Sequence, residues 1–167
     1  MKIQKCIYLV EGECEQKLIN ALKDDPTLLI PGKVKVFNII QKKVPQSILL
    51  SVRDCFVVLV FDVDVGNTDI LKANIANINK CCSGIKVITI PQVNNLEAEL
   101  VRATDVTKIQ QLTHSKSNSD FKRDFIKLSN CRSVLVSHNL DIRQLWAKKL
   151  ANVFSFVEQQ SNLIKQK

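Results

Sequence analysis

The chain has 167 residues, of which 46% are hydrophobic and 24% are charged, and its net charge is +8. This composition is that of a globular protein, and the length suits one domain with a proper core. No apolar run approaches the roughly 18 residues of a membrane span, which excludes a transmembrane helix. The first residues lack the cleavage region of a signal peptide, so we expect a cytoplasmic protein with no membrane partner.

The six cysteines form no C-x-x-C pair, and Cys6 and Cys55 lie within apolar segments that are typical of strands. We therefore expect reduced, mostly buried thiols rather than disulfides or a zinc site. His114 and His138 are not spaced as a pair of metal ligands, which also argues against zinc.

Strand patterns alternate with helix patterns along the first part of the chain. The strand patterns cover residues 3–10, 34–40, 55–61 and 85–90, and the helix patterns between them cover residues 14–22, 45–53 and 67–78. Such alternation predicts a parallel sheet with helices on both faces. Residues 133–136 form either a short fifth strand or a helical turn. We therefore predict an α/β fold, a three-layer Rossmann-like sandwich with a mainly parallel sheet of four to five strands, formed by residues 1–104.

Residues 105–167 differ from this core in charge. They contain 11 Lys and Arg against 5 Asp and Glu, whereas residues 1–104 contain 13 against 11. We predict that they form a basic, mainly helical C-terminal extension, packed on the core as part of a single globular unit. Its clearest helix should start at Asp141 and run to Val157, because apolar residues recur there with a period of 3.6 and include Trp146 as an anchor. The basic excess is compatible with a nucleic-acid partner.

Acidic residues follow two of the predicted strands. The first strand ends at Glu11, before Gly12, and the third ends at Asp62 and Asp64 with one residue between them. Side chains alternate along an extended chain, so Asp62 and Asp64 should point the same way. Ligands of open α/β sheets bind outside the carboxyl ends of the strands, and paired carboxylates favour Mg²⁺ or Mn²⁺ as a cofactor.

The Glu-Gly and Asp-x-Asp segments, two β-α units apart, together resemble the Toprim domain. This metal-binding module occurs in topoisomerases, bacterial primases, recombination proteins, small ribonucleases and the nucleases of phage-defence systems, and the resemblance covers residues 1–92. It implies that Asp62 and Asp64 bind Mg²⁺ and that Glu11 is a metal-proximal acid or the general acid/base of phosphoryl transfer. Glu13 and Glu15 lie near Glu11 and are alternative acids.

Within that superfamily the chain is similar to the small overcome-lysogenization-type and RloB-like nucleases. This similarity implies a further acid after the fourth strand, for which Glu97 is the candidate, with Glu99 behind it. It also implies a basic residue that meets transition-state charge, for which Lys116 and Lys122 are candidates. Both lysines are predicted contacts to nucleic acid, as is the neighbouring Arg123. The alternatives are that Glu97 only caps a helix and that the basic residues form a solvated face.

We therefore expect a Mg²⁺-dependent nuclease or phosphotransferase that acts on the phosphodiesters of DNA or RNA. The alternative is a non-catalytic Toprim-like module that binds nucleic acid or a partner ATPase. A haloacid-dehalogenase-like phosphatase ranks below both, because Gly66 stands where that family has threonine and a complete β-α-β-α unit precedes the aspartates. The choice between DNA and RNA and the oligomeric state stay open.

Overall fold

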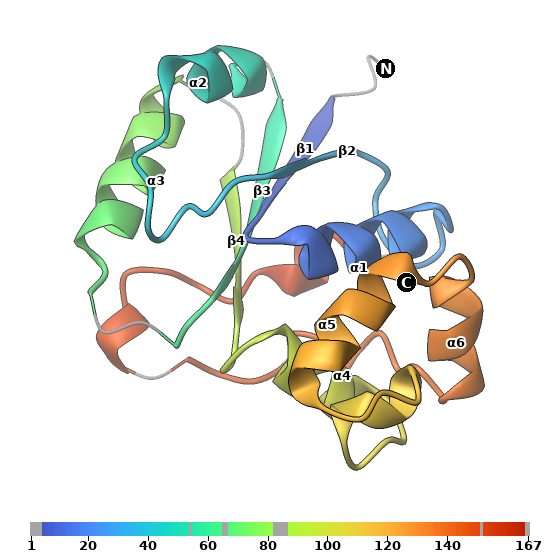
Figure 1. Ribbon diagram of the computed structural model, residues 1–167. Coiled ribbons are helices and arrows are strands. Elements are labelled where there is room, and N and C mark those ends of the chain that lie inside the picture. The colour runs from blue at the N-terminus through green and yellow to red at the C-terminus, as the bar shows by residue number, and fades with distance from the viewer. Residues whose placement is uncertain (1–4, 54, 65–66, 82–86, 151, 166–167) are drawn as a thin grey trace.

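Four parallel strands form the centre of the protein (Figure 1). The computed structural model describes residues 5–53, 55–64, 67–81, 87–150 and 152–165, so Gly66 and Cys82 lie outside the described residues. The strands are β1 (Cys6–Val10), β2 (Lys33–Val36), β3 (Phe56–Asp62) and β4 (Val87–Gln92). Their spatial order is β2-β1-β3-β4, and all three neighbouring pairs are parallel. Over the part of the chain described, the sheet therefore has four strands and no fifth.

Helices cover both faces of the sheet, which confirms the predicted three-layer α/β sandwich. On one face lie α2 (Gln46–Val52) and α3 (Asp69–Cys81), and on the other lie α1 (Glu13–Lys23), α4 (Leu96–Ala103), α5 (Asn118–Lys127) and α6 (Cys131–Ser137) (Figure 1). Residues 133–136 belong to α6, so the helical alternative for this segment is correct. None of the described helices combines the length and the apolar content needed to cross a bilayer.

The strand β3 is buried on both faces, as its uninterrupted apolar run predicts. Val58 and Val60 pack in one hydrophobic cluster with the helices α1, α4, α5 and α6, whereas Val57 and Leu59 pack in a second cluster with α2 and α3. Alternate side chains of a strand point to opposite faces, so one continuous apolar segment serves both layers. We call the two clusters the α1-side core and the α2-side core.

The predicted helix over residues 141–157 is wrong. This segment consists of turns and a 3₁₀ helix at Asn152–Phe154, and Trp146 has a left-handed backbone with φ of 57°, which interrupts any helix. The reason is that the segment crosses the edge of the sheet beside β4. Trp146 is buried in the α1-side core, whereas Phe154 and Val157 are buried in the α2-side core. A single helical stripe buries one face only, and these apolar residues serve two layers.

The C-terminal segment also covers the outer edge of β4. The backbone N–H of Gln160 donates to the carbonyl of Thr89 at 3.1 Å, and the Thr89 hydroxyl donates to the carbonyl of Glu158 at 2.7 Å. A further 3₁₀ helix, at Ser161–Leu163, follows, and an earlier one lies at Ile109–Leu112. These contacts satisfy polar groups that an edge strand would otherwise leave exposed.

Candidate active site

The carboxyl ends of three neighbouring strands bring together Glu11, Asp62 and Gln92. Asp62 and Gln92 face each other across β3 and β4, and Glu11 directly follows β1. The Glu11 carboxylate accepts a hydrogen bond from the backbone N–H of Asp62 at 2.9 Å and another from the Asn38 side-chain amide at 3.0 Å. Glu11 and Asp62 are therefore in direct contact although 51 positions separate them in the sequence.

The Asp62 side chain is held by the side-chain amide of Gln92. Its Oδ1 accepts a hydrogen bond from Gln92 Nε2 at 2.6 Å, and the same nitrogen lies 3.4 Å from Oε1 of Glu15. Glu15 belongs to the first turn of α1 and is buried. Oδ2 of Asp62 has no hydrogen-bond partner among the described residues and is not a buried unsatisfied atom, so it stays accessible to solvent or to a ligand.

Asp62 opens onto a pocket of about 220 Å³ between the first turns of α1 and α4 and the side of α5. Four carboxylates and one cation line it, from Glu13, Glu15, Asp62, Glu97 and Lys122. The Lys122 ammonium lies 3.1 Å from the Glu97 carboxylate, and this hydrogen bond raises the pKa of Lys122. The pocket therefore has an excess of negative charge close to the carboxyl edge of the sheet.

Burial of Asp62 raises the pKa of its carboxyl group to about 8, and the neighbouring charges of Glu15 and Glu11 act in the same direction. The hydrogen bond from Gln92 lowers this pKa but does not compensate for burial. Burial also raises the pKa of Glu15. Both groups favour a proton over an uncompensated charge, and a bound cation can take the place of that proton.

Two of the predicted acids lie beside this pocket and not in it. Glu11 does not line it, because both of its oxygens face the Asp62 backbone and Asn38. Asp64 lies beyond the end of β3, is exposed, and also does not line the pocket. We expected Asp62 and Asp64 to point the same way because side chains alternate along a strand. The strand β3 ends at Asp62, so this rule does not apply to Asp64.

The predicted basic residues separate into different environments. Lys122 lines the acidic pocket, whereas Lys116 lines a separate hollow of about 490 Å³. The Arg123 guanidinium forms ion pairs with Asp120 and Asp124 at 3.0 Å each, so its charge is neutralised on its own helix. Of the three predicted nucleic-acid contacts, only Lys122 therefore meets the acidic pocket.

The metal-ligand chemistry of the pocket fits a hard cation, although the ligands are not preassembled. Carboxylate oxygens are the ligands that Mg²⁺ and Mn²⁺ prefer. Asp62 supplies one unpartnered oxygen, and Glu15 and Glu97 line the same space. Within the described ranges, no three His, Cys, Asp or Glu side chains already converge on one point as a metal site. Binding a cation therefore requires these side chains to move.

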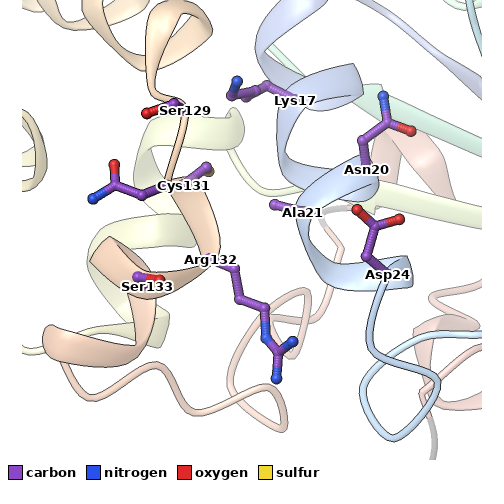
Figure 2. A pocket seen from close by; sticks show the side chains of 9 residues that line it. Lys17, Asn20, Ala21, Asp24, Ser129, Cys131, Arg132 and Ser133 are labelled. Atoms are coloured by element: carbon purple, nitrogen blue, oxygen red, sulfur yellow. The ribbon is translucent and has the colours of Figure 1, made fainter.

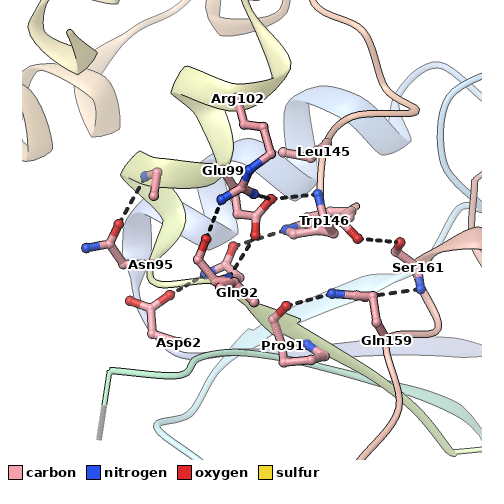
Figure 3. A network of polar contacts seen from close by, with 12 residues as sticks. Asp62, Pro91, Gln92, Asn95, Glu99, Arg102, Leu145, Trp146, Gln159 and Ser161 are labelled. Carbon is pink, nitrogen blue, oxygen red and sulfur yellow. Dashed lines mark hydrogen bonds and ion pairs between the residues drawn. The ribbon is translucent and has the colours of Figure 1, made fainter. Parts of the chain in front are cut away.

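A buried network of polar contacts extends from Asp62 through Gln92 to Trp146 (Figure 3). The Glu99 carboxylate accepts hydrogen bonds from the backbone N–H groups of Val93 and Trp146 at 2.8 Å each and pairs with Arg102. The Trp146 indole donates to Oε1 of Gln92 at 3.2 Å. Glu99 is completely buried and faces this network, so it is a structural acid rather than a pocket acid.

Sequence reasoning missed Gln92 as a site residue and named Glu15 only as an alternative. The signal for Gln92 was its place, a polar residue at the carboxyl end of an apolar strand, which is the same signal that indicated Asp62. Nothing in the sequence indicated that Trp146 lies next to Gln92, because a distant turn brings it there.

Another hollow, of about 360 Å³, lies between α1 and α6 (Figure 2). Lys17 and Arg132 line it together with one carboxylate, that of Asp24, and Arg132 pairs with Asp25. Asp24 follows the last residue of α1, so this hollow is at the opposite end of that helix from Gly12. It shares none of the acids described above.

The fold and the pocket together define a class, an α/β protein with an acidic pocket at the carboxyl edge of a parallel sheet. Comparisons with protein families, with curated proteins and with solved structures find no match to this chain.

Proposed function

We propose that the protein is a Toprim-like nuclease or phosphotransferase that uses Mg²⁺ or Mn²⁺ to act on nucleic-acid phosphodiesters. The observation that supports this most directly is the hydrogen bond from the Asp62 N–H to the Glu11 carboxylate. It joins the Glu-Gly segment and the Asp-x-Asp segment, on whose spacing the resemblance to Toprim domains rests. Acidic groups from the first and third strands meet at the edge of the sheet where α/β proteins bind ligands.

In this proposal, Asp62, Glu15 and Glu97 supply oxygen ligands to the cation. A bound divalent cation neutralises charge on the phosphate and lowers the pKa of a coordinated water. Asp64 is retained as a ligand because its charge contributes to the raised pKa of Asp62. Glu11 holds the Asp62 backbone in place and is near enough to act on a proton at the same edge.

The chain also has groups that suit the phosphate itself. Lys122 lies at the mouth of the pocket and is more than half exposed, so it can move from Glu97 to a phosphate oxygen. The helix α1 starts beside Asp62, and in its first turn the Glu15 carboxylate accepts a hydrogen bond from its own backbone N–H. The positive end of the helix dipole also favours an anion there. A Cβ at Gly12 would come within 3.0 Å of Glu15 Oε2, so glycine also leaves room for that carboxylate.

The test is cleavage of labelled single-stranded and duplex DNA and RNA in Mg²⁺, Mn²⁺ or EDTA. We expect cleavage only with a divalent cation and a loss of about 100-fold or more in Asp62→Asn. Asp24→Asn is the matched control, because it makes the same chemical change at the far end of α1. Cleavage by Asp62→Asn at the rate of the parent protein would refute the proposal.

One observation favours a second candidate, a non-catalytic Toprim-like module that binds nucleic acid or a partner ATPase. Both oxygens of Glu11 already have hydrogen-bond partners, and no ligand set is preassembled among the described residues. Titration calorimetry separates the two candidates. Heat on addition of Mg²⁺ or Mn²⁺ at neutral pH, lost in Asp62→Asn, supports the enzyme, whereas the absence of any heat supports the binding module.

A further inference from the structure

Five basic residues from the first half of the chain lie at the amino end of the sheet, opposite the candidate active site. They line two adjoining hollows of about 340 and 290 Å³ that share the side chain of Leu50. The first hollow contains Lys5, Lys33 and Lys35, and the second contains Arg53 and Lys80. We call these five residues the basic surface.

The charge of the basic surface is not neutralised by the described residues. Among the described residues, no carboxylate lines either hollow, and none of the five cations has an ion pair or a side-chain hydrogen bond. Asp54 lies outside those ranges. In contrast, Lys122 and Arg123, which sequence reasoning assigned to nucleic acid, both pair with acids. Unpaired cations attract polyanions more strongly than paired ones.

The strand β2 leads from the basic surface to the carboxyl edge of the sheet. This strand is at the edge of the sheet, with Lys33 beside Ile7 and Lys35 beside Leu9 of β1. The chain then reaches Asn38, whose amide donates to the Glu11 carboxylate. At about 3.3 Å per residue, the distance from Lys33 to Asn38 is about 16 Å. A strand of nucleic acid that follows β2 would therefore arrive at the carboxyl edge of the sheet, beside Glu11.

We propose that the basic surface binds the phosphate backbone of nucleic acid and directs it along β2 toward Glu11 at the carboxyl edge of the sheet. The identification of the polyanion as nucleic acid rests on the proposed function. Lys33 and Lys35 are two residues apart in an extended strand, about 6.6 Å, so both can contact the same phosphate backbone. Leu50 is 61% exposed between the two hollows, so it offers an apolar contact to a sugar or base.

The test is the salt dependence of binding to a labelled single-stranded oligothymidylate of about 20 nucleotides, in EDTA. If all five cations contact phosphates, the logarithm of the binding constant falls with the logarithm of salt with a slope of about −3.5. Lys33→Gln with Lys35→Gln should weaken binding and make the slope less steep by about 1.4. The same pair of changes at Lys148 and Lys149, which are exposed elsewhere, should alter neither quantity.

Several results would overturn this inference. One is a Lys33→Gln, Lys35→Gln variant that binds the oligonucleotide with the parent slope. Another is binding of polyglutamate, or of phosphatidylserine vesicles, at the same salt with no binding of the oligonucleotide. Because EDTA removes the cation, the binding result does not depend on catalysis. Unchanged oligonucleotide binding by an inactive Asp62→Asn variant supports binding at the basic surface. If the protein binds the oligonucleotide but shows no metal-dependent cleavage, only the enzymatic proposal is refuted.

Discussion

The indole N–H of Trp146 donates to the side-chain oxygen of Gln92, and this contact decides which end of the Gln92 amide faces Asp62. An indole can only donate, so the amide oxygen must face Trp146 at 3.2 Å. The amide nitrogen then faces Oδ1 of Asp62 at 2.6 Å. A residue of the C-terminal segment thereby sets the hydrogen bonding of the central pocket acid.

Replacing Trp146 with Phe should destabilise the protein and loosen Asp62. Gln92 is fully buried, so its oxygen would lose its partner at a cost of about 1–3 kcal/mol, in addition to the loss of packing. Urea unfolding measures the cost. A double-mutant cycle with Gln92→Leu isolates the hydrogen bond, and a coupling energy of about 1 kcal/mol is expected. Strict additivity of the two changes would mean that the indole does not orient the amide.

Without a divalent cation, stability should fall as pH rises from about 4 to about 8. The ordinary pKa of an aspartate is 3.8, and in the folded protein that of Asp62 is about 8. Between these values the folded state holds a proton that the unfolded state releases, so raising the pH favours unfolding. The decrease should exceed about 1 kcal/mol, the equivalent of one pKa unit. Urea midpoints from pH 4.5 to about 9 measure it, and saturating Mg²⁺ should reverse most of it.

Asp62→Asn should make the metal-free protein more stable at pH 9, although we expect it to lose the proposed cleavage. The amide removes a charge that lies beside Glu15 and Glu11, and its oxygen can still accept from Gln92. We expect a gain of about 1 kcal/mol in the free energy of unfolding. The gain should shrink toward pH 5, where Asp62 itself is protonated. An equal gain in stability at pH 5 and pH 9 would show that repulsion between the charges of Asp62, Glu15 and Glu11 is not the cause.

Glu97 and Glu99, two residues apart on α4, should behave in opposite ways. Glu99→Ala removes the acceptor of two backbone N–H groups and leaves Arg102 unpaired, so a loss of about 3–5 kcal/mol is expected. Glu97→Ala breaks only a partly exposed pair with Lys122 and should cost less than about 1 kcal/mol. Thermal unfolding compares the two variants, and metal-dependent cleavage by folded Glu97→Ala should be reduced. Similar destabilisation by both changes would contradict these assignments.

The periodicity of the first 104 residues was sufficient to predict the three-layer fold, because each strand or helix there has the regular hydrophobic spacing of its type. The apolar run before Asp62 is a strand buried on both faces, and Asn95 caps α4 with a hydrogen bond to the N–H of Ala98. The prediction failed at residues 141–157. The apolar spacing there resembles a helix, but the residues divide between two cores on opposite faces of the sheet.

The candidate site was predictable only in part. Strand ends in the sequence indicated Glu11 and Asp62, and the structure brings these two residues into contact. Asp64 follows the same strand as Asp62, and Lys116 is a basic candidate like Lys122, but both Asp64 and Lys116 lie outside the acidic pocket. Side-chain direction beyond a strand end, and the position of a loop, depend on tertiary packing that no local pattern contains.

The sequence by itself determined the layers of this protein and the acids at its strand ends, because hydrophobic periodicity and chain alternation are local properties. Only the tertiary structure decided that Gln92 and Trp146 control Asp62 and that the unpaired cations of the basic surface lie at the amino end of the sheet. Those relationships join residues that are far apart along the chain, such as the 54 positions between Gln92 and Trp146. Packing in three dimensions sets which charges are neutralised and which remain available to a ligand.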